Sequence, residues 1–353
     1  MTLTRRQLFA TVAGIALLVY LRALWNGFAL DDVSIIQTNP WVHRWSELWQ
    51  AFGQPYWPPW NGAAMYRPLP IASYALDWHT RSVMWMHAVN LLWHAGASVA
   101  VAALLIRLTE SESAALVGGV LFAVHPLHVE AVANVVGRAE LMAALFTVLA
   151  VYAALERDRL WWSLGALALG LLCKETAATA PALVVWGWML GIGRPGRRRM
   201  LAYVAGWTVV AVIYLAIRWT ILHPYGRLEH LAAVFIGASP LSVRFTTVAA
   251  LSDIARLLVF PAVLRVDYSP NERTLVTSPL DGRFLAGLLC FLVWAGLLWL
   301  AWRRGRRVEA FGLGWIAIAF LPVANLFFPT GVLVAERTLY LPSVGLALAA
   351  GAW

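Results

Sequence analysis

The chain alternates long apolar segments with short clusters of arginine, and this pattern limits the folds that it can adopt. Segments 9–25, 200–222 and 284–302 each carry at most one charged residue and reach the length of about 20 residues that a helix needs to cross a bilayer. Hydrophobic residues make up 61% of the 353 positions and charged residues 13%, compared with about 25% charged in a soluble domain. Such a composition excludes a single soluble fold, a disordered chain and a disulfide-stabilised scaffold.

The arginine clusters predict the topology. Cationic residues collect on the cytoplasmic side of membrane proteins, so we expect these clusters to mark that side. The formal net charge of +9 is explained in the same way, and we expect no nucleic-acid partner. The clusters are Arg5 and Arg6; Arg107; Arg157 and Arg159; Arg194, Arg197, Arg198 and Arg199; and Arg303, Arg304, Arg306 and Arg307.

Spans placed between these clusters predict an all-α polytopic membrane protein, a single domain over residues 1–353 with about ten transmembrane helices. Two long segments remain on the extracytoplasmic side: a first outer loop, 26–82, and a second outer loop, 223–283. The inner connections are short, so we expect any chemistry on the outer face. The predicted spans are 9–25, 83–106, 113–125, 140–155, 160–173, 176–191, 200–222, 284–302, 309–328 and 339–353.

The second outer loop contains a further apolar stretch, 243–264. It carries Arg244, Asp253 and Arg256, and charged side chains are costly in lipid. Because both ends of this loop must lie outside, we expect a re-entrant or interfacial helix here. The two halves of the chain show no matching pattern, which weighs against a secondary transporter built from inverted repeats.

The first outer loop opens with two adjacent carboxylates, Asp31 and Asp32, soon after the first span. Adjacent like charges near a low-dielectric boundary raise at least one carboxyl pKa, and a raised pKa suits a general base. The same dipeptide is also compatible with a solvated pair or a helix cap, so a catalytic role needs support from other residues.

Polar residues interrupt the apolar pattern most strongly at His125, His128 and Glu130. Their spacing differs from the i, i+4 histidine pair of zinc hydrolases, and the two cysteines offer no metal spacing, so we expect no metal site. On a helix, Glu130 and Arg138 would share one polar stripe. An ion pair between these two residues, acting as a structural lock, is the simplest alternative to a functional role.

Four of the cations outside the cytoplasmic clusters are candidates for function. Arg67 stands among aromatic residues of the first outer loop, and Arg138, Lys174 and Arg337 occupy short outer connections. Cations gathered at the outer surface can bind an anionic headgroup, above all a phosphate. Snorkelling or salt bridging is the alternative for each of them.

Several short strings, taken together and in order, resemble the membrane part of the transmembrane and tetratricopeptide-repeat-containing proteins, which are O-mannosyltransferases of the GT-C superfamily. The resemblance covers about residues 25–345. No 34-residue helical repeat follows in this sequence, and a truncated chain would explain that departure. The strings begin at Asp31 (DDVSI), Tyr66 (YRPL), His87 (HAVNLLWH), Phe122 (FAVHPLHVEAVA), Val136 (VGRAEL), Leu172 (LCKE), Arg256 (RLLVFP), Val266 (VDYS) and Ala335 (AERTLYLPS).

The resemblance implies a GT-C-like bundle and a polyprenyl or dolichyl phosphate sugar, with mannose expected, as the donor. It implies an inverting transfer to a protein hydroxyl on the extracytoplasmic face, with no cofactor. It assigns Asp31, with Asp32 beside it, as the carboxylate that activates the acceptor. The residues that would bind the donor phosphate are Arg67, Arg138, Lys174 and Arg337. The residues that would orient the acceptor are Glu130, His125 and His128.

Other classes of protein remain as alternatives. A transporter or flippase for a lipid-linked sugar would need polar residues near the membrane midplane, whereas the polar groups here gather at outer helix ends. A GT-C enzyme with a lipid or glycan acceptor and an inactive scaffold are further alternatives. Lys174 is the single lysine among 27 cationic residues, which is typical of a GC-rich genome. We therefore expect a bacterial inner membrane, with the active site facing the periplasm.

Overall fold

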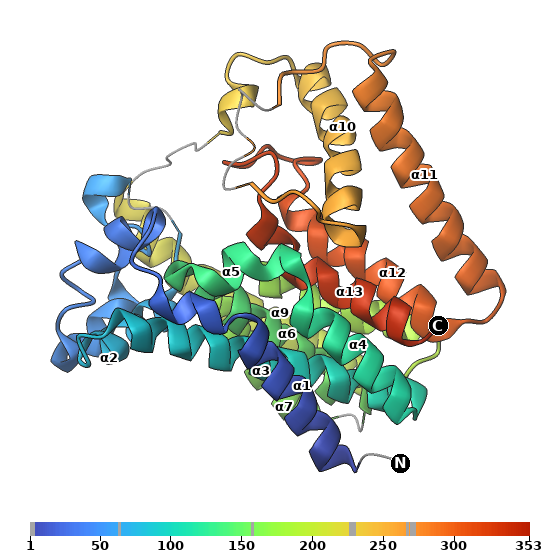
Figure 1. Cartoon of the computed structure of the whole chain (residues 1–353), viewed down its shortest axis with the longest axis horizontal. Helices are drawn as coiled ribbons and strands as arrows, with labels where there is room; N and C mark the ends of the chain where they lie inside the picture. Colours follow the sequence, from blue (N-terminus) through green and yellow to red (C-terminus); the bar gives the residue numbers. More distant parts are fainter. Residues whose placement is uncertain (1–3, 63–64, 157–158, 226–230, 266–267, 269–272) are drawn as a thin grey trace.

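The computed structural model describes residues 4–62, 65–156, 159–225, 231–265, 268 and 273–353, and its regular structure is helical (Figure 1). No β-strand occurs in these ranges, so the all-α class predicted from the sequence is confirmed. Arg157, Val266, Asp267 and Ser269, which the sequence analysis used, lie outside the described residues. The α-helices are α1 Arg5–Val19, α2 Pro68–Trp78, α3 Val83–Thr109, α4 Glu112–Val124, α5 Val129–Ala133, α6 Arg138–Glu156, α7 Leu160–Cys173, α8 Ala180–Met189, α9 Arg197–Leu222, α10 Pro240–Val259, α11 Gly282–Arg303, α12 Arg307–Phe320 and α13 Tyr340–Gly351.

Four helical segments in the described ranges are long and apolar enough to cross a membrane. A bent pair, Glu112–Val124 with Pro126–Ala133, adds a fifth if it forms one span. Helices also occupy the other predicted spans, but they are shorter, so the structure supports a membrane protein without confirming about ten spans. The four segments are Val83–Thr109, Val135–Glu156, Arg197–Tyr225 and Gly282–Arg303.

The long helix α3 lies at the centre of the bundle, where it packs against α1, α4 and α6. In the most apolar windows of α3 and of Val135–Glu156, 61% and 72% of the residues are buried, whereas the windows of α9 and α11 are only 11% buried. Leucine, valine and tryptophan side chains of α9 and α11 point outward instead. A helix with an outward apolar surface of this kind is suited to lipid, so α9 and α11 form the periphery of the bundle.

The first outer loop folds into short helices rather than an extended chain. These are η2 (Val33–Gln37), η3 (Trp45–Gly53) and η4 (Pro59–Asn61), followed by α2. The loop has an apolar core of its own, in which Ile35 and Tyr74 pack with Val136 at the start of the α6 segment. This core fixes the loop on the outer end of the bundle.

Two breaks between α4 and α6 turn the chain at the outer end of the bundle. Pro126 cannot continue α4, because proline has no amide hydrogen to donate and its ring collides with the preceding turn. The helical segments on the two sides of this break are bent by 47° relative to each other. Asn134 is extended (φ −100°, ψ 131°) and separates α5 from η6, Val135–Gly137. In the view of Figure 1, α5 therefore lies between the first outer loop and the pair α10–α11.

Glycines allow α12 and α13 to pack closely. A Cβ atom at Gly312 would lie 2.5 Å from the carbonyl oxygen of Gly345 and 2.6 Å from the nitrogen of Ala349, so no side chain fits there. The short helix η11, Glu336–Leu339, leads directly into α13. The packing of α13 on α12 and α4 therefore also fixes the position of η11.

Helix α10 runs beside the first half of α11 in the same direction (Figure 1). Near their starts, the rings of Phe245 and Phe284 lie 5.2 Å apart. Leu258, close to the end of α10, lines the same apolar groove as Trp294 in the middle of α11. The chain therefore returns outward after α10 before it enters α11, and α10 is not among the helices long and apolar enough to span.

Candidate active site

The structure separates the two adjacent carboxylates of the first outer loop. Asp32 is buried and accepts hydrogen bonds from the backbone amides of Val136 (2.8 Å), Val135 (3.4 Å) and Ala29 (3.2 Å). Burial raises the pKa of Asp32 to about 6, although these hydrogen bonds lower it. Asp31 is partly exposed. Asp32 thus attaches the loop to η6, and Asp31 is the member of the pair that a substrate can reach.

Arg67 is bound to Glu175, the first residue of η7 (Glu175–Thr179). Its Nε and Nη2 atoms lie 3.0 and 2.9 Å from Glu175 Oε2, and its guanidinium stacks over the Tyr56 ring, 5.1 Å from the ring centroid. The other carboxylate oxygen, Oε1, accepts a 2.8 Å hydrogen bond from Arg218 on α9. Burial alone would raise the pKa of Glu175, but Arg67 and Arg218 hold it at about 2, so Glu175 is ionised at neutral pH.

Lys174 is buried and pairs with Glu140 of α6. Burial lowers the pKa of Lys174, and Glu140 raises it. Arg67 and Arg337 lower it further, so both arginines lie within electrostatic reach of this lysine. Three of the four predicted phosphate-binding cations are therefore gathered near one carboxylate, Glu140.

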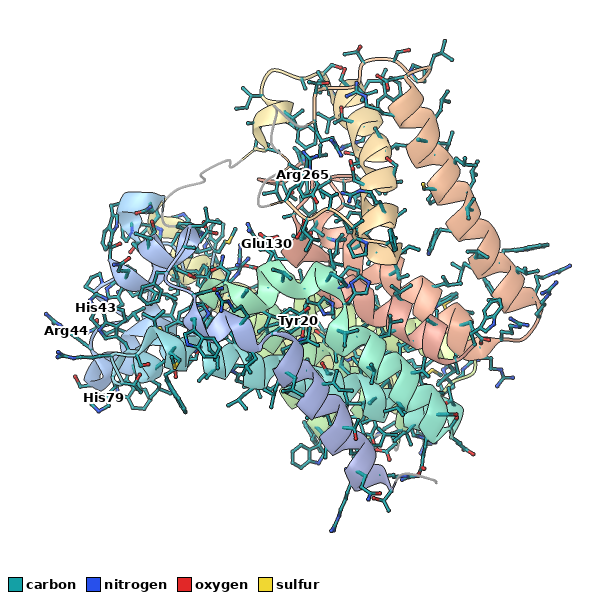
Figure 2. All side chains as sticks on the ribbon, in the orientation of Figure 1. Tyr20, His43, Arg44, His79, Glu130 and Arg265 are labelled. Carbon is teal, nitrogen blue, oxygen red and sulfur yellow. The ribbon has the colours of Figure 1, made fainter. Side chains whose placement is uncertain are left out.

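Arg337 is held by Glu130 of α5. The Arg337 backbone amide donates to Glu130 Oε2 at 2.8 Å, and its Nη1 atom donates to Oε1. Burial lowers the pKa of Arg337 and Glu130 raises it. Asp31 and Glu140 act in the same direction as Glu130, so the partly exposed Asp31 lies within electrostatic reach of the same cation. Figure 2 shows Glu130 between the first outer loop and the segment after α10 that carries Arg265.

Arg138 is enclosed by protein groups. Its guanidinium pairs with Asp77 of α2, donates to Asn90 Oδ1 and the Met86 carbonyl oxygen at 2.8 Å each, and stacks over the Tyr74 ring. Its side chain is fully buried. The Glu130–Arg138 pair considered from the sequence is not formed, because each residue has another partner. The contacts of Arg138 support a structural role.

The two histidines lie in packed surroundings. His125 Nε2 lies 2.9 Å from the Leu258 carbonyl oxygen of α10, and its own carbonyl oxygen accepts from the Tyr20 hydroxyl at 2.7 Å. His128 Nε2 lies 2.7 Å from Ser343 Oγ in α13. These contacts join the α4–α5 break to neighbouring helices. Over the described ranges, no group of three or more histidine, cysteine or acidic side chains could hold a metal ion.

Two carboxylates and one arginine of this site were not predicted from the sequence. Glu140 and Glu175 stand in the quoted strings, but no role was given to either, and Arg218 was not singled out at all. The available signal for Arg218 was a charged residue inside an otherwise apolar predicted span, 200–222. A charge within a membrane span is by default a functional candidate.

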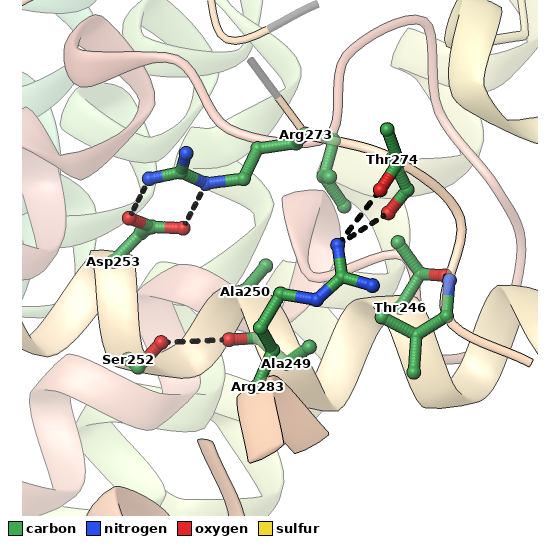
Figure 3. A pocket seen from close by; sticks show the side chains of 10 residues that line it. Thr246, Ala249, Ala250, Ser252, Asp253, Arg273, Thr274 and Arg283 are labelled. Atoms are coloured by element: carbon green, nitrogen blue, oxygen red, sulfur yellow. Dashed lines mark hydrogen bonds and ion pairs between the residues drawn. The ribbon is translucent and has the colours of Figure 1, made fainter. Parts of the chain in front are cut away.

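A second group of charges lies apart from this site, between α10 and α11 (Figure 3). Asp253 accepts from Arg273 Nε at 2.7 Å, and Arg283 Nη1 donates to Thr274 Oγ1 at 2.9 Å. Together with Thr246 they line a cavity of about 240 Å³. Arg283 also pairs with Asp281. Both arginines thus have carboxylate partners, and the cavity carries no excess of positive charge.

The fold defines a helical membrane protein, and three ion-paired cations and the partly exposed Asp31 lie in the connections and short helices between its long helices. The chain is 29% identical to the human protein O-mannosyl-transferase TMTC3 over 96% of its own length and 41% of that protein. It is 30% identical to the mouse protein of the same name, covering 93% and 40%. It is 28% identical to the Caenorhabditis elegans protein O-mannosyl-transferase F38B6.6, covering 95% and 49%.

These relatives confirm the resemblance to the transmembrane and tetratricopeptide-repeat-containing protein O-mannosyl-transferases over nearly the whole chain. The chain spans between two fifths and half of the length of the relatives named above. No family model matches the chain, and no solved structure matches it.

Proposed function

We propose that this chain is a GT-C-like glycosyltransferase that moves a sugar, with mannose expected, from a polyprenyl or dolichyl phosphate to a protein hydroxyl. The similar proteins are named protein O-mannosyl-transferases, which supports both the sugar and the acceptor. The reaction takes place on the extracytoplasmic face, at the ends of one membrane domain with two outer loops. The membrane is the inner membrane of a bacterium.

One observation supports this proposal: the partly exposed Asp31 lies within electrostatic reach of Arg337, and Arg337 belongs to a set of cations from distant parts of the chain. Arg67 directly precedes α2, Lys174 directly precedes η7, and Arg337 lies in η11. Both arginines lie within electrostatic reach of Lys174. Asp31 is coupled to Arg337. A carboxylate opposite clustered cations is the arrangement that a hydroxyl nucleophile and an anionic leaving group require.

In the proposed reaction the acceptor oxygen attacks the anomeric carbon on the face opposite the phosphate, which inverts the configuration. The hydroxyl proton passes to the Asp31 carboxylate. The bond between the anomeric carbon and the phosphate oxygen breaks, and the electron pair leaves with the polyprenyl phosphate. This leaving group is a weak base and needs no general acid. It gains negative charge, which Arg67, Lys174 and Arg337 stabilise as preorganised cations.

The other polar residues support these groups. Asp32 fixes the loop that carries Asp31 through its hydrogen bonds to η6. Glu130 binds both the backbone and the side chain of Arg337, so it is a positioning residue for that cation. His125 and His128 stabilise the α4–α5 break. No cofactor takes part in this scheme.

The test is a transfer assay with purified protein, polyprenyl phosphate mannose and a mixture of serine- and threonine-containing peptides. Mass spectrometry should detect free polyprenyl phosphate together with mannosylated peptide, and both should depend on the acceptor. A glycan or lipid product instead of a peptide would reassign the acceptor. Donor movement across vesicles without any sugar transfer would replace the enzyme with a flippase.

A further inference from the structure

Two arginines from distant parts of the chain converge on one carboxylate. Arg67 precedes α2 and contacts Glu175 Oε2, whereas Arg218 lies near the outer end of α9 and contacts Glu175 Oε1 at 2.8 Å. Two guanidinium groups repel each other unless an anion lies between them. In this structure a protein carboxylate supplies that anion, so the site is an anion site that the chain fills with its own side chain.

The charges at this site are not balanced. Two cations share one carboxylate, which leaves one positive charge, and the neighbouring cation Lys174 is neutralised by its own partner, Glu140. A phosphate has more acceptor oxygens and at least as much charge as a carboxylate, and guanidinium groups bind it bidentately. A phosphate is therefore a better occupant of this position than Glu175.

The site can be reached from the membrane. The side chains of Arg218 and Glu175 are 31% and 32% exposed, and that of Arg67 is 12% exposed. Arg218 belongs to α9, whose apolar window is only 11% buried and faces outward. A lipid chain lying along α9 would bring its headgroup to the level of Arg218, one turn before the end of the helix.

We propose that Arg67 and Arg218 form a clamp for the phosphate of the lipid donor, and that Glu175 occupies this clamp until the phosphate displaces it. The proposal rests on the proposed function and adds Arg218 to the donor site. In this proposal the Glu175 carboxylate competes with the lipid phosphate for the two arginines. Because Glu175 is one third exposed, its carboxylate can turn toward water when the phosphate binds.

The test is the affinity for geranylgeranyl phosphate in detergent, measured by native mass spectrometry. Arg67→Gln and Arg218→Gln should each raise Kd at least tenfold. Glu175→Gln should lower Kd at least threefold, because the competing carboxylate is gone. Glu175→Asp, whose shorter side chain cannot reach both arginines, should also bind more tightly and serves if the Gln variant does not fold.

Matched controls distinguish displacement of Glu175 from an effect of net charge and from binding of a soluble anion. Glu309→Gln removes the same charge at the start of α12, where no proposed donor-binding cation lies, and an equal gain in affinity there would reduce the effect to net charge and overturn the clamp. Weaker binding by Glu175→Gln would make Glu175 a support for the arginines and also overturn it. Geranylgeraniol should not bind, and inorganic phosphate should compete only weakly; equal binding of inorganic phosphate would mark a soluble anion site instead. Failure of the wild type to bind the lipid phosphate would contradict the proposed function itself.

Discussion

Asp32 accepts a 2.8 Å hydrogen bond from the backbone amide of Val136, a residue 104 positions away in the sequence. This bond joins the first outer loop to the start of the α6 segment, and a second bond from Val135 strengthens the junction. The same junction fixes the direction of the loop at Asp31. The two neighbouring carboxylates therefore differ in role: Asp32 holds the backbone of η6, and Asp31 lies within electrostatic reach of Arg337.

Replacing Asp32 with alanine should destabilise the protein. The buried amides of Val135 and Val136 would lose their acceptor, and each buried donor left unsatisfied costs about 1–3 kcal/mol. Asp31→Ala is the matched control, because Asp31 is partly exposed and should leave the unfolding temperature nearly unchanged. Thermal unfolding in detergent distinguishes the two variants, and equal melting temperatures would remove Asp32 from this structural role.

Glu175 should contribute stability that depends on pH in a defined direction. Its pKa is lowered from an ordinary value of 4.5 to about 2, so the ionised form is favoured by the folded state. The contribution is fully present above pH 4.5 and is lost as the pH falls toward 2. The melting temperature of the wild type should exceed that of Glu175→Gln at pH 6, and the difference should shrink by pH 3. A difference that grows on acidification would contradict the ion pairing.

Arg138 should act through stability rather than through donor binding. Removing it leaves the buried Asp77 carboxylate with its hydrogen bond from Trp85 but without a cation, and breaking a buried ion pair costs about 3–5 kcal/mol. Arg138→Ala and Asp77→Ala should each lower stability strongly, whereas the double variant should lose less than the sum of the two. Additive losses would show that the two side chains do not interact. A folded Arg138→Ala protein with weakened donor binding would return Arg138 to the phosphate site.

Arg337 and Glu130 should behave as one unit in catalysis. Arg337→Gln should lower kcat by about 10² at saturating donor, the loss typical of removing one preorganised group that stabilises transition-state charge. Glu130→Gln should lower kcat in the wild type and have little further effect in the Arg337→Gln background. Rates measured for the two single variants and the double variant give this comparison. Independent, multiplying losses would assign Glu130 a separate role, such as orienting the acceptor.

Local chemistry made part of this structure predictable from the sequence. Apolar runs bounded by arginine clusters indicated the helical class, and Pro126 marked the break after α4 for a steric reason. Cationic residues normally collect on the cytoplasmic side, and the cations that depart from this rule were predicted to lie together on the outer side. Arg67 and Arg337 do lie within electrostatic reach of Lys174. The number of spans could not be fixed, because several of the helices in the predicted spans are short.

Partners of buried charges could not be predicted, because they depend on long-range packing. Glu130 and Arg138 would share one face of a continuous helix, yet the extended Asn134 breaks the helix between them. Glu130 then meets Arg337, which lies 207 positions away, and Arg138 meets Asp77 of α2. Arg218 was hidden in an apolar span for the same reason, since its partner is on another segment of the chain.

The most direct test of the proposed mechanism compares wild type and Asp31→Asn in the release of polyprenyl phosphate from polyprenyl phosphate mannose with a peptide acceptor. We expect Asp31→Asn to unfold at the same temperature and to bind geranylgeranyl phosphate with an unchanged Kd. Its acceptor-dependent release should fall by at least about 10², the lower end of what a general base contributes. Release at the wild-type rate by folded Asp31→Asn would show that Asp31 is not the general base.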